Sequence, residues 1–222
     1  MKSLLGERRD AVALTARGVH LDRWWAVRGV DGKLGSGKTT RRFRRMPGLL
    51  TMASSVDDDG RAWVHLPDGG VRPVDDPATA RLVEAVVGES VDLATERDVS
   101  HLDDGPVHVL TTSSLRWLER RLPNDGVDVR RFRPNVLLDT DDVAGDRVEE
   151  MWIGLQLQIG DAVLRVTKPA IRCVMAAQAQ EELAFAPRIV GELDDANELN
   201  LGVYAAVERP GTIAVGDTVE IV

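Results

Sequence analysis

The residue pair best suited to chemistry in this sequence is Arg172-Cys173, and Cys173 is the only cysteine of the 222-residue chain. A thiolate is a nucleophile and a soft metal ligand, and a neighbouring cation favours that ionised form. A free cysteine is equally often a small buried hydrophobic residue. The pair therefore leaves two interpretations open, a functional thiol and an inert one. A single cysteine excludes an intrachain disulfide, an all-cysteine zinc site and an iron–sulfur cluster.

A second candidate is Arg133-Pro134-Asn135, which comes just before an apolar run. Proline disfavours helical backbone in the residue before it, so we expect an extended segment. Side chains two apart in an extended segment face the same way, which would let Arg133 and Asn135 address one ligand. Arginine suits phosphate, and asparagine offers a donor and an acceptor. The same tripeptide is also common at an ordinary strand entry.

Residues 32–39 match the phosphate-binding pattern G-x-x-x-x-G-K-[ST] letter for letter. A true P-loop leads into a helix with an apolar stripe. Residues 40–45 lack such a stripe, and Pro47 would stop a helix within about two turns. We therefore predict an exposed glycine-rich loop. Five of the eight residues from Lys38 to Arg45 are cationic, which indicates either a solvated loop or an electropositive rim for an anionic ligand or an acidic redox partner.

The overall composition is that of an acidic globular protein. The chain has 28 Lys and Arg against 36 Asp and Glu, for a formal charge of −8, which argues against general nucleic-acid binding. No stretch reaches the ~18 apolar residues of a membrane helix, and the start of the chain turns charged too soon for a signal peptide. We expect a cytoplasmic protein that binds neither membranes nor nucleic acid.

The elements that must position these residues are mostly short strands bounded by turn residues. We predict strands at 12–15, 24–27, 49–54, 62–66, 107–111, 135–138, 155–159, 162–166, 201–207 and 218–222. A helix capped by Asp76 begins at Pro77, a second begins near Thr112 and ends at Pro123, and a weaker third within 178–193 is broken by Pro187. The predicted class is mainly β with a few helices, and the boundary lies between a domain at 1–90 and one at 91–222.

Five motifs in one order resemble the MOSC domain, named for the C-terminal part of molybdenum cofactor sulfurases. They are Arg133-Pro134-Asn135, Trp152-x-Gly154, Leu157-x-Ile159-Gly160-Asp161-Ala162, Arg172-Cys173 and Pro210-Gly211-Thr212-Ile213-x-Val215-Gly216-Asp217. The start of the chain, with Lys2-Ser3-x-x-Gly6-Glu7 and Asp22-Arg23-Trp24-x-Ala26-Val27, looks like the N-terminal domain that accompanies MOSC in its amidoxime-reducing branch. The resemblance implies a β-barrel MOSC domain packed with a smaller, barrel-like N-terminal domain.

What the resemblance implies for the site is molybdopterin-bound molybdenum with Cys173 as catalytic metal ligand. The cofactor brings its own dithiolene sulfur and a phosphate. The positions that match cofactor-contacting residues of the family, or lie at a helix N-terminus suited to phosphate, are Lys2, Ser3, Arg23, Thr111, Thr112, Ser113, Arg133, Asn135 and Arg172. The family has an extended segment before its Lys-Ser, so we expect the natural start to lie upstream of Met1 and Lys2 to be poorly held.

The implied function is an oxidoreductase that reduces N-hydroxylated small molecules, with electrons from a separate donor protein. The alternative is a sulfur carrier, with a persulfide on Cys173 delivered by a cysteine desulfurase that holds the pyridoxal phosphate. After the cysteine, the amidoxime-reducing branch has an Asp-Pro-x-Thr-Gly-like turn where this chain has residues 176–181, Ala-Ala-Gln-Ala-Gln-Glu. The substrate is therefore left open.

Overall fold

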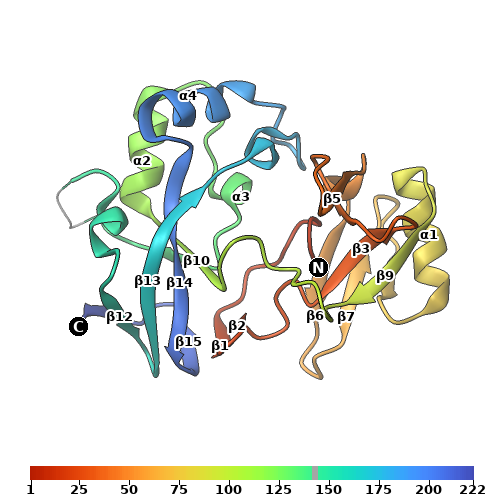
Figure 1. Cartoon of the computed structure of the whole chain (residues 1–222), viewed down its shortest axis with the longest axis horizontal. Coiled ribbons are helices and arrows are strands. Elements are labelled where there is room, and N and C mark those ends of the chain that lie inside the picture. The colour runs from red at the N-terminus through yellow and green to blue at the C-terminus, as the bar shows by residue number, and fades with distance from the viewer. Residues whose placement is uncertain (142–144) are drawn as a thin grey trace. The chain divides into compact units, whose positions relative to one another are not determined.

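The computed structural model describes residues 1–141 and 145–222, which form two compact units (Figure 1). The first unit comprises residues 1–8, 21–102 and 179–184. The second comprises residues 9–20, 103–178 and 185–222. Each unit is thus assembled from three separate stretches of the chain, and the domain boundary expected at residues 90/91 stays a prediction.

The first unit contains two small sheets and one long helix. The four-stranded sheet has the order β5-β4-β3-β9, and the three-stranded sheet has the order β6-β7-β8. Their bounds are β3 Trp25–Gly29, β4 Leu34–Ser36, β5 Phe43–Arg45, β6 Ala53–Val56, β7 Ala62–His65, β8 Val71–Pro73 and β9 Val91–Thr95. The helix α1 spans Pro77–Val87, and a 3₁₀ turn spans Leu49–Thr51.

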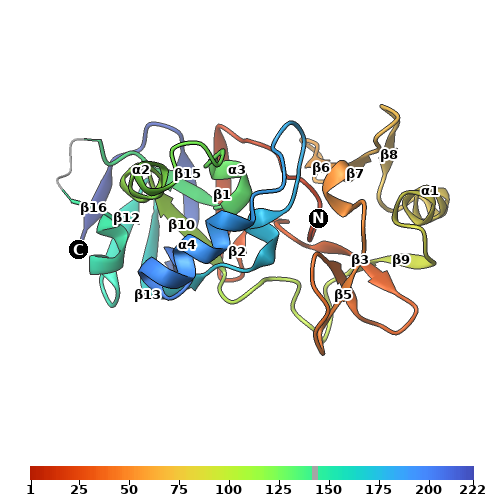
Figure 2. The same ribbon diagram turned by 90° about the horizontal axis from the view of Figure 1, so that it is seen from above.

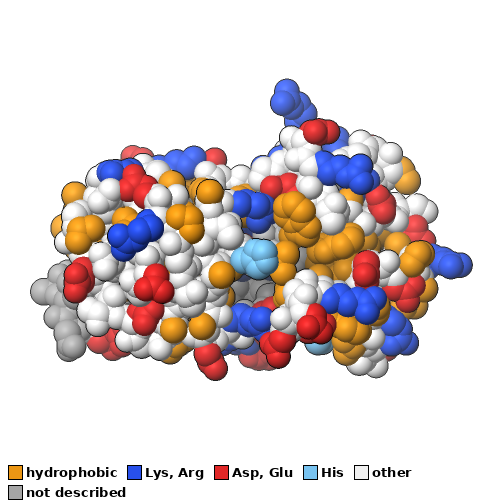
Figure 3. All heavy atoms as spheres, turned by 90° about the horizontal axis from the view of Figure 1, so that it is seen from below, with side chains coloured by type: hydrophobic (Ala, Val, Ile, Leu, Met, Phe, Trp, Pro, Cys, Tyr) orange, Lys and Arg blue, Asp and Glu red, His pale blue; other side chains and the backbone are white. Residues whose placement is uncertain are grey.

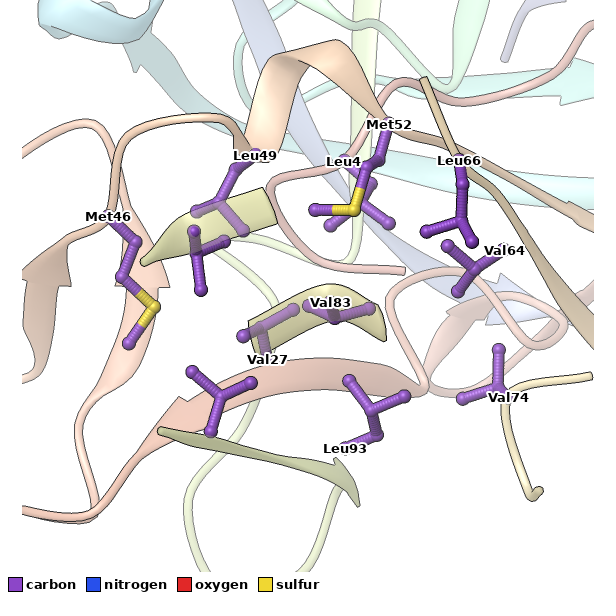
Figure 4. Packing of buried hydrophobic residues seen from close by; sticks show 12 residues of the cluster. Leu4, Val27, Met46, Leu49, Met52, Val64, Leu66, Val74, Val83 and Leu93 are labelled. Atoms are coloured by element: carbon purple, nitrogen blue, oxygen red, sulfur yellow. The ribbon is translucent and has the colours of Figure 1, made fainter. Parts of the chain in front are cut away.

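The core of the first unit brings both sheets and α1 together (Figure 4). Leu4, Val27, Val64 and Val83 are fully or almost fully buried within it. Helix α1 begins where predicted, because the carboxylate of Asp76 accepts a hydrogen bond from the backbone N–H of Ala78 at 2.8 Å. Its buried residues Thr79, Val83 and Val87 recur every four positions, so they share the helix face that packs against this core.

The second unit is built on a six-stranded sheet with the order β11-β10-β14-β13-β12-β16. Strands β10 and β11 are parallel and the other neighbours are antiparallel. A three-stranded sheet, β15-β1-β2, completes the unit. The bounds are β1 Ala11–Thr15, β2 Gly18–Val19, β10 Val107–Thr111, β11 Val136–Leu138, β12 Gln156–Ile159, β13 Ala162–Ile171, β14 Asn200–Arg209, β15 Gly211–Ala214 and β16 Val219–Ile221.

Three helices cover one region of this sheet, and α2 and α4 lie beside each other in both views (Figures 1 and 2). One buried cluster contains Leu118 of α2, Ile189 of α4 and Leu110 of β10. The helices are α2 Thr112–Arg121, α3 Val129–Phe132 and α4 Pro187–Asn197, and 3₁₀ turns span Val148–Trp152 and Val174–Ala177. The described part of the chain has no helix long and apolar enough to span a bilayer.

The predicted class, mainly β with a few helices, is confirmed, and three local expectations need comment. The strand predicted at 49–54 is wrong in its first half, where Leu49–Thr51 forms a 3₁₀ turn after Gly48, whose φ is +85°. Pro187 does not break a helix but begins α4, because proline lacks only an N–H that the first turn leaves unbonded. The P-loop look-alike at 32–39 leads into strand β5 and not into a helix, but it is not the exposed loop that we predicted. Its residues Leu34–Ser36 are buried because they form strand β4 between β3 and β5.

Candidate functional site

The candidate site of the second unit starts at two neighbouring strands, where Asn135 and His108 are joined by two hydrogen bonds. The side-chain Oδ1 of Asn135 accepts from the backbone N–H of His108 at 2.9 Å. The backbone N–H of Asn135 donates to the carbonyl oxygen of His108 at 2.8 Å. The parallel pairing of β10 with β11 begins at the next residues, Val109 and Val136. Asn135 therefore fixes the backbone at the entry of both strands.

The buried guanidinium of Arg172 lies on the other side of His108. Its Nη1 donates to the carbonyl oxygen of Phe132 at 3.0 Å and lies 3.4 Å from Nδ1 of His108, while Nη2 lies 3.2 Å from the hydroxyl of Tyr204. Its Nε donates to the carbonyl oxygen of Ala170 at 3.1 Å. Because arginine can only donate, Nδ1 of His108 must accept, and the proton of a neutral His108 is on Nε2, 3.3 Å from the carbonyl oxygen of Leu201.

Arg172 is 9% exposed, and no carboxylate of the described residues forms an ion pair with it. Its hydrogen bonds end on neutral groups, namely two carbonyl oxygens, a phenol and an imidazole. A buried charge without a counter-charge is unfavourable, because neutral partners replace only part of its hydration. This part of the unit therefore carries an uncompensated positive charge, which an anionic group would neutralise.

Cys173 follows directly, in extended backbone with φ −126° and ψ −179°, and precedes the 3₁₀ turn at Val174–Ala177. Neighbouring side chains of an extended segment face opposite ways, so the thiol faces away from the Arg172 guanidinium. The thiol is free and half-buried. Ile171, 60% exposed, and Val174, 42% exposed, flank it in the chain. The sulfur thus lies at an accessible position with apolar neighbours.

The strand-to-helix turn predicted at Thr111–Ser113 is present, with Thr111 as the N-cap of α2. The hydroxyl groups of this turn form hydrogen bonds with carboxylates of the same chain. Thr111 Oγ1 donates to the carboxylate of the fully buried Glu149 at 2.6 Å, and the hydroxyl of Ser114 donates to the other oxygen. The Thr112 hydroxyl lies 2.9 Å from a carboxylate oxygen of Asp141. Burial raises the pKa of Glu149 above its ordinary value, although the hydrogen bonds from Thr111 and Ser114 oppose the shift.

Three of the predicted cofactor contacts, Lys2, Ser3 and Arg23, belong to the first unit. Lys2 is not poorly held: it is 3% exposed, its backbone N–H donates to the carbonyl oxygen of Trp25 at 2.8 Å, and its ammonium lies 5.1 Å from the centre of the Phe43 ring. Ser3 and Arg23 both have positive φ, 65° and 51°. Arg23 forms an ion pair with Asp22.

Within the second unit, the structure brings Asn135, His108 and Arg172 into one contact chain, with Cys173 next along the backbone. Arg133 departs from expectation, because it ends α3 in the left-handed conformation, φ 54° and ψ 49°, and is not extended. The strand alternation that would have aimed Arg133 and Asn135 at one ligand is therefore absent. Their roles as ligand contacts stay predictions.

Sequence reasoning missed His108, Tyr204 and Glu149. His108 and Tyr204 face each other across β10 and β14, 96 residues apart in the chain, with ring centres 5.7 Å apart. Both sit in apolar runs, where a histidine and a tyrosine resemble ordinary core residues. The one available signal was the polar side chain of His108 within an apolar run. The burial of His108 and Glu149 became visible only in the structure.

Comparison with known proteins assigns most of the second unit to a family. The MOSC domain family matches residues 96–220, more than half of the chain. Mitochondrial amidoxime-reducing component 1 of Mus musculus is 30% identical over 158 residues, covering 64% of this chain and 42% of that protein. The Homo sapiens protein of the same name is 30% identical over 142 residues, covering 58% and 40%. The chain thus spans about two fifths of the length of these relatives.

Among solved structures, YiiM from Geobacillus stearothermophilus matches with a TM-score of 0.40 and 20% identity, over 54% of this chain and 55% of that one. The YUAD protein from Bacillus subtilis matches with a TM-score of 0.45 and 11% identity, over 97% and 86%. The family match rests on the sequence of residues 96–220, which include β10 to β16 together with Arg172 and Cys173. The chain belongs to the MOSC domain family.

Proposed function

We propose that this protein is a molybdenum-cofactor-dependent oxidoreductase that reduces N-hydroxylated small molecules, with Cys173 as the protein ligand of the metal. The observation that carries the proposal is the free, half-buried thiol of Cys173, which directly follows Arg172 in the chain, a buried cation that has no ion pair with any described carboxylate. The similarity to mitochondrial amidoxime-reducing component 1 supports the substrate class. Electrons would come from a separate donor protein, because one cysteine cannot hold an iron–sulfur cluster.

The residues present fit such a group. A thiolate is a soft ligand that would suit molybdenum already bound by the sulfurs of its cofactor, and the buried positive charge of Arg172 would favour an anionic cofactor in this part of the unit. When bound, the cofactor supplies two-electron chemistry, by which an N–OH group plus two electrons and two protons gives N–H and water. His108 and the carbonyl oxygens of Phe132 and Ala170 hold the Arg172 fork in one orientation.

The test compares molybdenum content and turnover in the wild type, Cys173→Ala and the neighbouring control Val174→Ala. Each is expressed in a host that makes the cofactor, analysed for molybdenum, and given an aromatic amidoxime with a chemically reduced dye. We expect the wild type and Val174→Ala to contain molybdenum and to form the amidine, and Cys173→Ala to lose turnover. Full activity in Cys173→Ala, or a wild type that carries no molybdenum, would contradict the proposal.

The second candidate function is a sulfur carrier, which the half-buried and free state of Cys173 also suits. A cysteine desulfurase would deliver the sulfur as a persulfide. Incubation with such an enzyme and free cysteine, followed by mass spectrometry, would then show an adduct of about 32 Da on Cys173, the mass of one sulfur atom. A stable adduct in a protein that contains no molybdenum would favour the carrier over the reductase.

A further inference from the structure

The charge of this acidic protein is unevenly distributed, and one segment of the first unit is purely basic. Residues 32–56 contain six Lys and Arg and no Asp or Glu. The rest of the chain contains the other 22 Lys and Arg together with all 36 Asp and Glu. Five of the six cations lie at 38–45, within the loop and strand that run from Gly37 to Arg45. We call residues 37–45 the basic loop.

Elsewhere in the molecule, cations are commonly neutralised by nearby carboxylates. Oppositely charged side chains lie next to each other at several places on the face in Figure 3. The ion pairs include Arg28–Asp92, Arg61–Asp75, Arg120–Asp146, Arg165–Glu208 and Arg188–Asp125. Within the basic loop itself, Arg44 pairs with Asp31 and Glu89. Paired cations leave little field for a partner, since each is matched at contact distance.

Three cations of the basic loop differ from this pattern. Lys38, Arg41 and Arg45 form no ion pair with any carboxylate that the structure describes. Arg41 and Arg45 are exposed, and Lys38 is half-buried with its ammonium 5.6 Å from the centre of the Phe43 ring. The three are separated by only a few residues, so their fields add at the surface of the first unit.

The backbone that carries these cations is held by its own threonines. Thr40 Oγ1 accepts from the N–H groups of Arg42 and Phe43, at 3.2 and 3.1 Å, and the N–H of Thr40 donates to the carbonyl oxygen of Phe43 at 2.9 Å. Thr39 Oγ1 accepts from the N–H of Arg45 at 3.2 Å. A loop ordered in this way presents its charges with little further loss of backbone entropy on binding.

We propose that the basic loop is a docking site for an acidic protein surface. A bilayer-binding surface would need exposed apolar side chains to insert, but Phe43 and Met46 are buried and Thr39, Thr40 and Arg41 are exposed. Single-stranded nucleic acid would need an exposed aromatic ring for stacking, which the basic loop does not offer. Separately exposed arginines suit carboxylates spread over a protein surface. This inference stands without the proposed function, although an electron-donor protein with an acidic surface would be such a partner.

The test measures binding of a fluorescein-labelled peptide of glutamates, about twelve residues long, to the full chain by fluorescence anisotropy. The variant is K38Q/R41Q/R45Q, and the matched control is R72Q/R81Q/R97Q. The control removes three exposed cations of the first unit that form no ion pair with a described carboxylate, so both variants change the net charge equally. We expect the variant to bind about tenfold more weakly at low salt and the control within about twofold of the wild type.

Binding of the wild type should also weaken as salt rises from about 20 to about 200 mM, because screening acts on exposed charges. Equal losses in both triple variants would overturn the proposal, since net charge alone would then explain binding. Tighter binding to anionic phospholipid vesicles than to the peptide, or displacement of the peptide by millimolar inorganic phosphate, would also overturn it. If the triple variant fails to show the wild-type circular dichroism spectrum, Arg41→Gln against Arg72→Gln repeats the comparison with single exposed residues.

Discussion

Asn135 makes two hydrogen bonds to the backbone of His108: its side-chain oxygen accepts from the His108 N–H at 2.9 Å, and its own N–H donates to the His108 carbonyl oxygen at 2.8 Å. His108 in turn contacts Arg172, the residue before Cys173 in the chain. Asn135, which the family resemblance marks as a cofactor contact, therefore also supports the position of Arg172. A side chain with such a structural task affects stability even when no cofactor is present. Stability measured without cofactor therefore distinguishes a structural role of Asn135 from direct contact with a ligand.

Asn135→Ala should lower the free energy of unfolding of the cofactor-free protein by about 1–3 kcal/mol, because the N–H of His108 loses its acceptor in a buried strand. Asn135→Asp keeps an acceptor oxygen and should lose less. Urea denaturation of both variants gives the two values. Equal losses for Ala and Asp would show that the accepted hydrogen bond is not the cause.

Arg172→Lys should destabilise the protein and reduce its cofactor content, although the charge is kept. One ammonium cannot reach the carbonyl oxygens of Ala170 and Phe132 and the hydroxyl of Tyr204 together, which the planar fork does. We expect a loss of about 1–3 kcal/mol. Arg188→Lys is the control, since that exposed arginine pairs with Asp125 at the surface and should change stability by less than about 0.5 kcal/mol. Similar values for the two variants would contradict the buried-fork account.

Glu149 should make the protein less stable as the pH rises. Burial raises its pKa in the folded state, so the folded protein holds this proton at pH values where the unfolded chain has already released it. Its contribution is therefore fully present below the unfolded pKa, about 4.3, and is lost as the pH rises through the folded pKa. Glu149→Gln cannot titrate, so the stability of the wild type relative to this variant should fall as the pH rises from about 4, below the unfolded pKa, to about 7.5. Urea denaturation of both proteins at the two pH values checks this, and a constant or rising difference would contradict it.

Gly202→Ala should disturb His108 directly. Gly202 has φ +80°, and a Cβ there would lie 2.5 Å from Nε2 of His108 and 2.7 Å from the carbonyl oxygen of Val109. Strain and displacement together should cost about 2–4 kcal/mol. Gly191→Ala is the matched control: it lies on α4 with nothing within 4 Å of the new Cβ, so it should stabilise the helix by about 0.5–1 kcal/mol. Thermal unfolding distinguishes the two signs, and a neutral Gly202→Ala would show that His108 has room to move.

Much of the local structure follows from the sequence, because its signals act between near neighbours. Asp76 and Pro77 start α1, and Thr111 caps α2, since a side-chain acceptor and a missing N–H satisfy the first turn locally. The short apolar runs predict β1, β7, β10 and β12 for the same reason. Pro187 shows where local signals are insufficient. Proline interrupts a helix in its interior but is favoured at its first turn, so its role depends on where the helix lies.

The amino-acid sequence by itself determined the mainly β class, the MOSC resemblance and the place of Cys173 as the single thiol. Only the tertiary structure decided what surrounds Arg172. His108, Phe132 and Tyr204 reach it from β10, α3 and β14, and no spacing rule links positions that are 32 to 64 residues away from it. The same holds for Arg133, whose left-handed backbone is set by the end of α3 against the preference imposed by Pro134. Local rules act over a few residues, whereas burial and counter-charge depend on which strands become neighbours.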